Sequence, residues 1–280
     1  MNTLRRLAPA LASLALASTA LTGCLEHPVK TVQYNSVVAC DEVVDVTPRR
    51  EVDILFVIDN SGSMGEEQAI LSANFERFVD KLDIAGANYR LAVTTTDVGN
   101  SIYCNDSTPE DGAFVLSTCH DRAEHFYNEP LDIDRFVEAC EQHCPAEFAG
   151  AGTTPSQIAE SEELVARPWI EHFGNGVTNL ADMTPSQAFQ CFGPQGIDGC
   201  GYNESPLQAM YRALERSQDP NDPAYGFVRE DALLAVVFIT DENDCSVAEH
   251  AIDIFHPNGD RAFWEDKSLG GPTSAVCWNA

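Results

Sequence analysis

Three oxygen-bearing side chains follow one apolar run of the sequence at alternating positions. Residues 52–58, VDILFVI, are almost entirely apolar, and DNSGSM at residues 59–64 comes directly after them, placing Asp59, Ser61 and Ser63 in one glycine-containing turn. A carboxylate and two hydroxyls are hard oxygen donors, which suit Mg²⁺ or Mn²⁺ better than a metal that prefers sulfur. The spacing therefore indicates a divalent-metal loop, although a helix-start turn capped by Ser63 would explain the same composition without a metal.

A second apolar run ends in the same way. Residues 232–239, ALLAVVFI, lead into TDEND at residues 240–244. Nearly continuous apolar runs are typical of strands covered on both faces, as in parallel sheets. Ligands of such sheets bind at the carboxyl ends of the strands. We therefore expect Asp59 and Asp241 to meet at one edge of a sheet, and we interpret Asp244 as a solvated loop acid.

Helices and further strands are expected between these two runs. Residues 66–82 are predicted to be helical because their apolar residues recur at helical spacing: Leu71, Phe75, Phe78 and Leu82. A second helix is predicted over residues 205–216, with one apolar face: Leu207, Met210, Tyr211 and Leu214. Strands are expected at residues 89–97 and, as a short edge strand, at 113–117. This order predicts an α/β fold with a doubly wound, mostly parallel sheet of the Rossmann type.

The two acid-tipped strands, together with NESPLQAM at residues 203–210, resemble a von Willebrand factor A-type domain. The metal-ion-dependent adhesion site (MIDAS) of that family uses Asp-x-Ser-x-Ser after the first strand, a Thr or Ser from a second loop, and an Asp from the end of the fourth strand. The resemblance covers roughly residues 50–245, apart from a cysteine-rich segment. It implies a set of metal ligands: Asp59, Ser61, Ser63, Ser205 and Asp241. Glu204 is the alternative to Ser205.

The resemblance also implies how such a site works. The ion would be Mg²⁺ or Mn²⁺, with Ca²⁺ as a further candidate. If both carboxylates act through water, the ion stays electrophilic and binds an Asp or Glu side chain of a protein partner at its open position. The protein would then be an adhesion or interaction module and not an enzyme. Ser205, before Pro206 and three residues ahead of Gln208, also fits a helix N-cap with a partial capping box.

The C-terminal part is short for this family, whose sheet usually has two more strands and a closing helix after the fourth strand. Residues 246–280 contain one short strand-like run, AIDIF at residues 251–255, and no signal for a terminal helix. We therefore expect the last strands to be absent from this chain and the reading frame to continue beyond Ala280. The sheet edge beside the fourth strand would then be exposed, and a partner could cover it.

The N-terminus has the layout of an export signal. Arg5 and Arg6 precede an apolar, alanine-rich stretch that is too short and interrupted to predict a membrane span. Residues 21–24, Leu-Thr-Gly-Cys, resemble the bacterial lipobox, which implies cleavage after residue 23 and lipidation of Cys24. Leu25 favours the outer membrane, because an inner-membrane retention signal would usually place Asp there. We expect a signal peptide at residues 1–23, a tether at 24–50 and one domain at 51–280. More than one acyl chain on Cys24 would anchor the protein to the membrane.

The chain is strongly acidic, with a formal net charge of −28. Removal of the signal peptide would take away only Arg5 and Arg6, so the mature part is more acidic still. Such a surface repels nucleic acid and anionic head groups, which makes both poor partner candidates, with the lipid anchor as the only membrane attachment. It is compatible with divalent cations.

Ten cysteines are present, and nine remain if Cys24 is lipidated. In an exported chain these predict disulfides, with one cysteine left over; a partner for Cys245 or Cys277 in a missing C-terminus would explain the odd number. Five cysteines lie in residues 118–200, which we interpret as a disulfide-rich insertion. The alternative there is tetrahedral zinc, since suitable ligands are close in sequence: Cys119, His120, Cys140, His143 and Cys144.

Two other functions fit parts of the sequence. The order Ser63, Asp241, His250 matches that of a secreted serine hydrolase, but the nucleophile motif needs a glycine two residues before the serine, where this chain has Ser61. The protein could also be a structural envelope protein in which the metal only stabilises the fold.

Overall fold

The computed structural model describes residues 50–100, 102, 108–200, 204–273 and 275–280. The expected signal peptide and lipidation site, nearly all of the tether, Cys40 and Cys104 lie outside the described residues. No helix within these ranges is both long enough and apolar enough to cross a membrane.

The centre of the fold is a four-stranded mixed sheet with the order β7-β2-β1-β8. Its strands are β1 (Glu51–Ile58), β2 (Asn88–Thr95), β7 (Ile170–His172) and β8 (Leu233–Ile239). β1 pairs in parallel with both β2 and β8, and β7 runs antiparallel to β2. The predicted strands at residues 52–58, 89–97 and 232–239 are confirmed.

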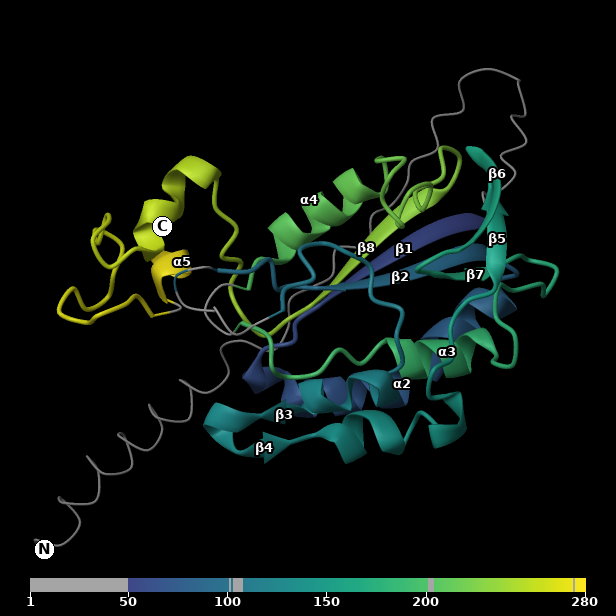
Figure 1. The fold of residues 1–280 in the computed structure, drawn as a ribbon, viewed down its shortest axis with the longest axis horizontal. Coiled ribbons are helices and arrows are strands. Elements are labelled where there is room, and N and C mark those ends of the chain that lie inside the picture. The colour runs from purple at the N-terminus through teal and green to yellow at the C-terminus, as the bar shows by residue number, and fades with distance from the viewer. Residues whose placement is uncertain (1–49, 101, 103–107, 201–203, 274) are drawn as a thin grey trace, which may run out of the picture. The chain divides into compact units, whose positions relative to one another are not determined.

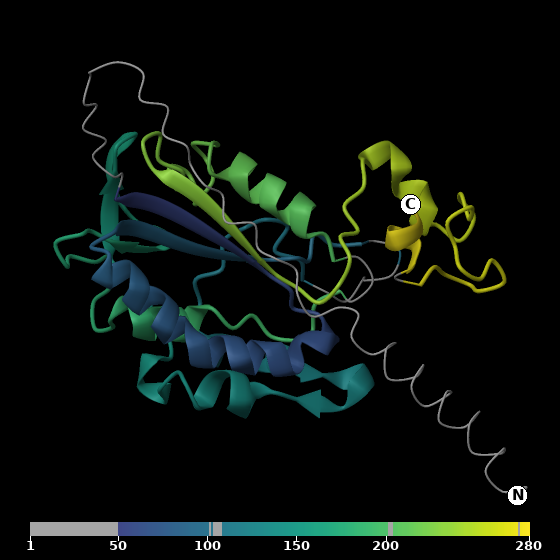
Figure 2. The ribbon, with the colours of Figure 1, turned by 180° about the vertical axis from the view of Figure 1, so that it is seen from behind.

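Helices cover both faces of this sheet, so the protein is a mixed α/β fold (Figures 1 and 2). The helices α2 (Gly65–Ile84) and α3 (Pro185–Phe192) lie on one side, and α4 (Pro206–Arg216) lies on the other. On the α2 side, Phe56 of β1 packs against the aromatic rings of Phe75 and Phe189. Successive β1 side chains alternate between the two faces, and each face is buried, which explains the nearly continuous apolar run.

The helix predicted at residues 66–82 is confirmed as α2. Glu66 and Glu67 lie in its first turn, where negative charge suits the helix dipole. The helix ends at Ile84 with Ala85 as its C-cap, and Gly86 follows with a φ of 62°, a left-handed backbone conformation that favours glycine.

The helix predicted at residues 205–216 is confirmed as α4, but its predicted buried face is wrong in part. Leu207 and Tyr211 are 49% and 59% exposed, whereas Ala209 and Ala213 are fully buried against the sheet. Small side chains let this helix approach β1 closely, and the larger apolar residues are displaced to its flanks.

The edge strand predicted at residues 113–117 is wrong. This segment makes one ladder-like bond, from the Val115 N–H to the Val93 carbonyl (2.8 Å), and the edge strand beside β2 is β7. Residues 118–200, expected as an insertion, thus supply both β7 and α3 to the main sheet and its cover. The smaller elements of this segment are η2 (Cys119–Phe126), β3 (Tyr127–Asn128), η3 (Glu129–Leu131), β4 (Ile133–Asp134), η4 (Val137–Glu141), η5 (Ala146–Phe148), β5 (Pro155–Ile158) and β6 (Ser161–Ala166).

The C-terminal residues differ from expectation. The run at 251–255 is part of a 3₁₀ helix, η6 (Glu249–Phe255), and a short helix α5 (Ala275–Asn279) follows, so the prediction of no terminal helix is wrong. The apolar residues of this run, among them Ile254 and Phe255, pack into a small cluster with Trp264 instead of extending the sheet. Within the described residues β8 is the outer strand on its side, and its Leu233 and Phe238 are exposed.

Acids within the buried strands are paired with arginines. Asp53 lies in β1 and is fully buried, and its carboxylate accepts hydrogen bonds from the backbone N–H (2.7 Å) and Nε (2.8 Å) of Arg229. Glu171 of β7, also fully buried, pairs with Arg90 Nε at 2.8 Å. These pairs explain how a carboxylate is tolerated in an otherwise apolar interior, where an unpaired charge would be costly.

Three disulfides are present in the described residues: Cys119–Cys140, Cys144–Cys191 and Cys245–Cys277. Cys200 is also disulfide-bonded. The prediction that Cys245 or Cys277 lacks a partner is therefore wrong, because the two pair with each other. The Cys119, Cys140 and Cys144 sulfurs lie within 4.8 Å of one another, but as disulfide sulfurs they are not the thiolates that zinc requires.

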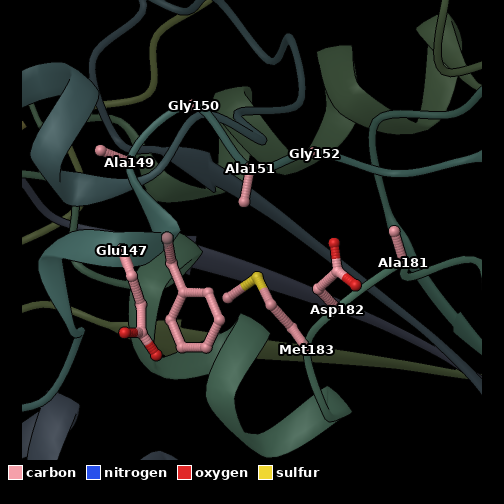
Figure 3. Close-up of a pocket in the computed structure, with 9 residues that line it drawn as sticks. Glu147, Ala149, Gly150, Ala151, Gly152, Ala181, Asp182 and Met183 are labelled. Atoms are coloured by element: carbon pink, nitrogen blue, oxygen red, sulfur yellow. The ribbon is translucent and has the colours of Figure 1, made fainter.

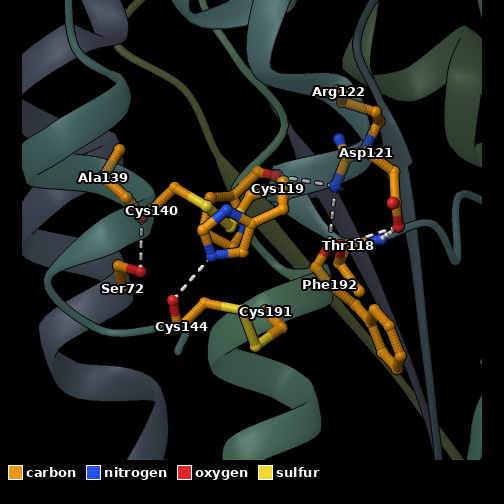
Figure 4. The surroundings of a disulfide bond; sticks show 12 residues. Ser72, Thr118, Cys119, Asp121, Arg122, Ala139, Cys140, Cys144, Cys191 and Phe192 are labelled. Atoms are coloured by element: carbon orange, nitrogen blue, oxygen red, sulfur yellow. Dashed lines mark hydrogen bonds between the residues drawn. A yellow bond between two sulfur atoms is a disulfide. The ribbon is translucent and has the colours of Figure 1, made fainter. Parts of the chain in front are cut away.

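The first two disulfides cross-link segments within residues 118–200, and they lie beside α2 and α3 (Figure 4). The Ser72 hydroxyl of α2 donates a hydrogen bond to the Ala139 carbonyl (2.8 Å), beside Cys140. Cys191 lies in α3 and holds Cys144, whose carbonyl contacts His120 Nε2 at 2.8 Å. All four cysteines are part of the core beneath the sheet.

Replacement of Cys144 and Cys191 by alanine is expected to lower the free energy of unfolding by about 3–4 kcal/mol, because this bridge closes a long loop within the core. Urea unfolding of the oxidised protein measures this change. The matched control replaces Cys245 and Cys277 by alanine. Their disulfide lies in the small C-terminal cluster, so its loss should change the free energy of unfolding of the sheet less. A larger shift for the control would contradict this assignment.

Candidate metal-binding site

The strands that precede Asp59 and Asp241 end next to each other. β1 and β8 are parallel neighbours, with Ile58 opposite Ile239, and the Asp59 N–H donates to the Ile239 carbonyl at 2.9 Å. This register brings the loop after β1 and the loop after β8 to the same edge of the sheet. The expectation that Asp59 and Asp241 reach one edge thus follows directly from the parallel pairing.

Hydrogen bonds link four of the five predicted ligands into one cluster. Ser63 Oγ donates to Asp241 Oδ1 at 3.1 Å, across the two loops, and lies 3.1 Å from Ser61 Oγ. The Ser61 N–H donates to Asp59 Oδ1 at 2.8 Å. Asp59, Ser61, Ser63 and Asp241 therefore occupy one compact site.

Thr240 is a member of this cluster that sequence reasoning missed. Its hydroxyl donates to Asp59 Oδ2 at 2.7 Å, so the residue before Asp241 orients the acid of the other strand. Its place between an apolar run and an acid was the available signal. The Asp59 carboxylate thus has a hydrogen bond on each oxygen, which fixes its direction.

Ser205, the fifth predicted ligand, is brought to the same edge by its backbone. Its N–H donates to the Thr96 carbonyl (3.0 Å), and the Thr96 N–H donates to the Ile58 carbonyl (3.2 Å), which places it beyond the ends of β2 and β1. From the other side, the Cys245 N–H donates to the Glu204 carbonyl at 2.8 Å. Both Glu204 and Ser205 are buried. The segment before α4 is therefore held between the other two loops.

The expected cap of α4 is wrong. The Ser205 side chain makes no capping hydrogen bond. Instead, Asp244 Oδ1 accepts from the Leu207 N–H (3.1 Å) and Ser246 Oγ accepts from the Gln208 N–H (2.8 Å). Asp244 is thus a helix cap supplied by the loop after β8 and not a solvated loop acid, so α4 and that loop are fixed to each other.

The electrostatics of the cluster are dominated by negative charge. Burial raises the pKa of Asp59 above its ordinary value, although the hydrogen bonds from Thr240 and Ser61 oppose this. Burial, followed by the charge of Asp59 and more weakly those of Glu242 and Asp241, raises the pKa of Glu204 to about 8, although a hydrogen bond with its own backbone N–H opposes this. Glu242 is raised in the same direction by burial, Asp241 and Asp59. No basic side chain contributes to any of these three shifts.

This donor set fits a hard divalent cation. Hydroxyl and carboxylate oxygens from separate loops converge where no basic side chain of the described residues shifts the pKa values of these acids, and a bound dication would offset the repulsion between them. The ion would be held by Asp59, Ser61, Ser63 and Asp241, with the segment at 204–205 beside them.

The cysteine-rich insertion supports the metal loop from below. Gln68 of α2 is fully buried; its Nε2 donates to the Asp59 carbonyl (2.8 Å), and its Oε1 accepts from the Gln195 N–H (2.9 Å). The Gly199 N–H donates to the Asn60 carbonyl (2.8 Å), and a Cβ at Gly199 would overlap the Asn60 amide, so a larger residue there would displace that side chain. The loop is thereby held between helix and insertion.

The described residues give less support to a ligand pocket or to a serine nucleophile than to the metal site. A pocket is lined by residues that include Glu147, Asp182 and Met183 with the glycines at 150 and 152, and none of its lining residues is a predicted ligand (Figure 3). The hydroxyl of Ser63 bonds to Asp241 and Ser61, and among the described residues no histidine ring bonds to it, so the geometry does not provide the base that a serine nucleophile needs.

No protein-family model matches this chain, and no curated protein is significantly similar to it. The functional interpretation therefore depends on the fold and on the geometry of the cluster.

Replacement of Gln68 by methionine should lower the free energy of unfolding by about 2–4 kcal/mol, because it leaves the Asp59 carbonyl and the Gln195 N–H buried without partners. The control is the same change at the exposed neighbour Glu67, which should stay within about 0.5 kcal/mol of the wild type. Chemical unfolding of both variants provides the comparison. Equal stability of the two would show that Gln68 does not support the metal loop.

Proposed function

We propose that this protein is a von Willebrand factor A-type domain that binds a divalent metal ion and, through it, an acidic side chain of a protein partner. The observation that supports this best is the hydrogen bond from Ser63 Oγ to Asp241 Oδ1, because it joins the two loops that the family's metal site requires. The parallel neighbours β1 and β8, with helices on both faces of the sheet, agree with that family's architecture.

Each residue would have a defined part in the loaded site. The ion, Mg²⁺ or Mn²⁺ with Ca²⁺ as a further candidate, supplies a Lewis-acidic position open to an anionic oxygen. The Ser61, Ser63 and Ser205 hydroxyls would hold the ion, and Asp59 and Asp241 would act on it through water. Thr240 and the Ser61 N–H hold the Asp59 carboxylate in place.

We place the protein among binding modules and not among enzymes, because the Ser63 hydroxyl is engaged by an acid and a second hydroxyl. A purely stabilising metal is the second candidate, favoured by the buried acids whose repulsion an ion would relieve. A lipid anchor at Cys24 in the outer membrane is proposed from the sequence of residues 1–25 alone.

Calorimetric titration of the protein with Mg²⁺ and Mn²⁺ tests the metal site. The wild type should release or absorb heat with one-to-one stoichiometry, and Asp59→Ala should weaken binding at least tenfold, because it removes a fixed carboxylate from a cluster with few donors. Glu162→Gln removes an exposed acid of β6 and should bind like the wild type. No binding by the wild type, or equal binding by all three proteins, would refute the metal site.

Partner binding is tested separately from metal binding. The immobilised protein should retain an envelope protein in Mg²⁺ and release it in a chelator, and Asp59→Ala should retain nothing in either. Metal binding without any metal-dependent capture would favour the purely stabilising role.

A further inference from the structure

The hydroxyl of Thr96, directly after β2, is buried without a hydrogen-bond partner in the described part of the chain. Thr96 is fully buried, and its Oγ1 makes no hydrogen bond to any described residue. The preceding residue differs, because the Thr95 hydroxyl donates to Glu110 Oε2. Buried hydroxyls are normally bonded to protein, to water or to a ligand. The expected partner of Thr96 is therefore a group that these residues do not supply.

Backbone pairing places Thr96 next to Asp59. Ile58 lies opposite Thr95 in the parallel register of β1 and β2. The Thr96 N–H donates to the Ile58 carbonyl at 3.2 Å, so the ladder continues one residue beyond the strand. Asp59 and Thr96 are thus neighbours across the two strands, at the edge where the metal site is proposed.

The same pairing fixes the face of the sheet toward which both side chains project. Ile58 and Val93 pack in the cluster on the α2 face. Side chains alternate along a strand, so Asp59 and Thr96 project from the opposite face, which α4 covers. From the β8 side the Thr240 hydroxyl donates to Asp59 Oδ2 at 2.7 Å. Asp59 is therefore flanked by one threonine on each neighbouring strand.

Thr96 is also adjacent to the second-loop ligand. The Ser205 N–H donates to the Thr96 carbonyl at 3.0 Å, and Ser205 comes directly before α4 on this face. Both Asp59 oxygens already accept other bonds, from Thr240 and from the Ser61 N–H. The Thr96 hydroxyl consequently lies beside two of the proposed ligands and is bonded to neither.

We infer that the Thr96 hydroxyl is a further contact of the proposed ion, made through a bound water. The inference rests on the proposed function and adds a residue from the end of β2 to a site built from three other loops. A hydroxyl can donate to one group and accept from another. A small divalent ion such as Mg²⁺ keeps several of its waters in a protein site. Thr96 would orient one of these waters and is therefore a positioning residue.

Calorimetry with Mn²⁺ on the whole mature chain tests this inference. Thr96→Val keeps the shape of the side chain but removes the hydroxyl, and it should weaken Mn²⁺ binding at least fivefold. Thr96→Ser keeps the hydroxyl and should bind Mn²⁺ within twofold of the wild type.

Thr94 provides a matched control. It is fully buried, its Oγ1 likewise makes no hydrogen bond to a described residue, and it projects from the same face two residues before the edge. Thr94→Val should therefore bind Mn²⁺ within twofold of the wild type. Urea unfolding in a chelator should show both valine variants at least as stable as the wild type, because each loses an unpartnered buried hydroxyl. Added Mn²⁺ should then stabilise Thr96→Val less than Thr94→Val.

The outcomes distinguish this inference from the proposed function. Wild-type affinity in Thr96→Val, or equal weakening by the two valine variants, would overturn the role of Thr96 and leave the proposed function standing. Lower stability of Thr96→Val in the chelator would do the same, since it would show that the hydroxyl has a partner in the metal-free protein. Absence of Mn²⁺ binding by the wild type would overturn both.

Discussion

Negative charge concentrated at the carboxyl edge of β1 and β8 is the constraint on which the rest of the structure depends. The parallel register of these strands places Asp59 and Asp241 in adjacent loops, and Glu204 is buried between the loop after β8 and the end of β2. Within the described part of the chain, these acids receive hydrogen bonds from hydroxyls and backbone N–H groups, and no basic side chain pairs with them. A cluster of this kind is costly without a cation and therefore has a physical reason to bind one.

The surrounding fold keeps these acids together against their repulsion. Three separate connections converge on the edge: Gln68 from α2, the insertion through Gly199, and Asp244, which ties the loop after β8 to α4. The insertion is in turn cross-linked internally by two buried disulfides whose cysteines are part of the core, and Ser72 of α2 bonds to it at Ala139. The cysteine-rich segment is therefore part of the apparatus that holds the metal loop, in addition to supplying an edge strand and a helix. Rigid support of this kind would hold the donor atoms in place for the proposed ion.

The sequence predicted the central strands and the meeting of Asp59 and Asp241, because buried parallel strands have a strong apolar signal and their ends must share an edge. The apolar face of α4 was not predictable in the same way. Its spacing favoured Leu207 and Tyr211, but closeness to the sheet selected Ala209 and Ala213 for burial. The side chains that cap α4, Asp244 and Ser246, lie 37 and 38 residues away from the N–H groups they bind, so no local sequence pattern predicts them. Likewise, the run at 251–255 has strand-like composition, but a separate cluster around Trp264 makes it a 3₁₀ helix.

The central claim is that one divalent ion is held jointly by the loops after β1 and β8. Anomalous X-ray diffraction from crystals of the protein grown with Mn²⁺ tests it most directly. We predict that the strongest anomalous peak lies within metal–oxygen bonding distance of the Ser61 and Ser63 hydroxyls, on the side facing Asp241. A well-ordered site with no peak there, or a peak bound only elsewhere on the acidic surface, would contradict the account.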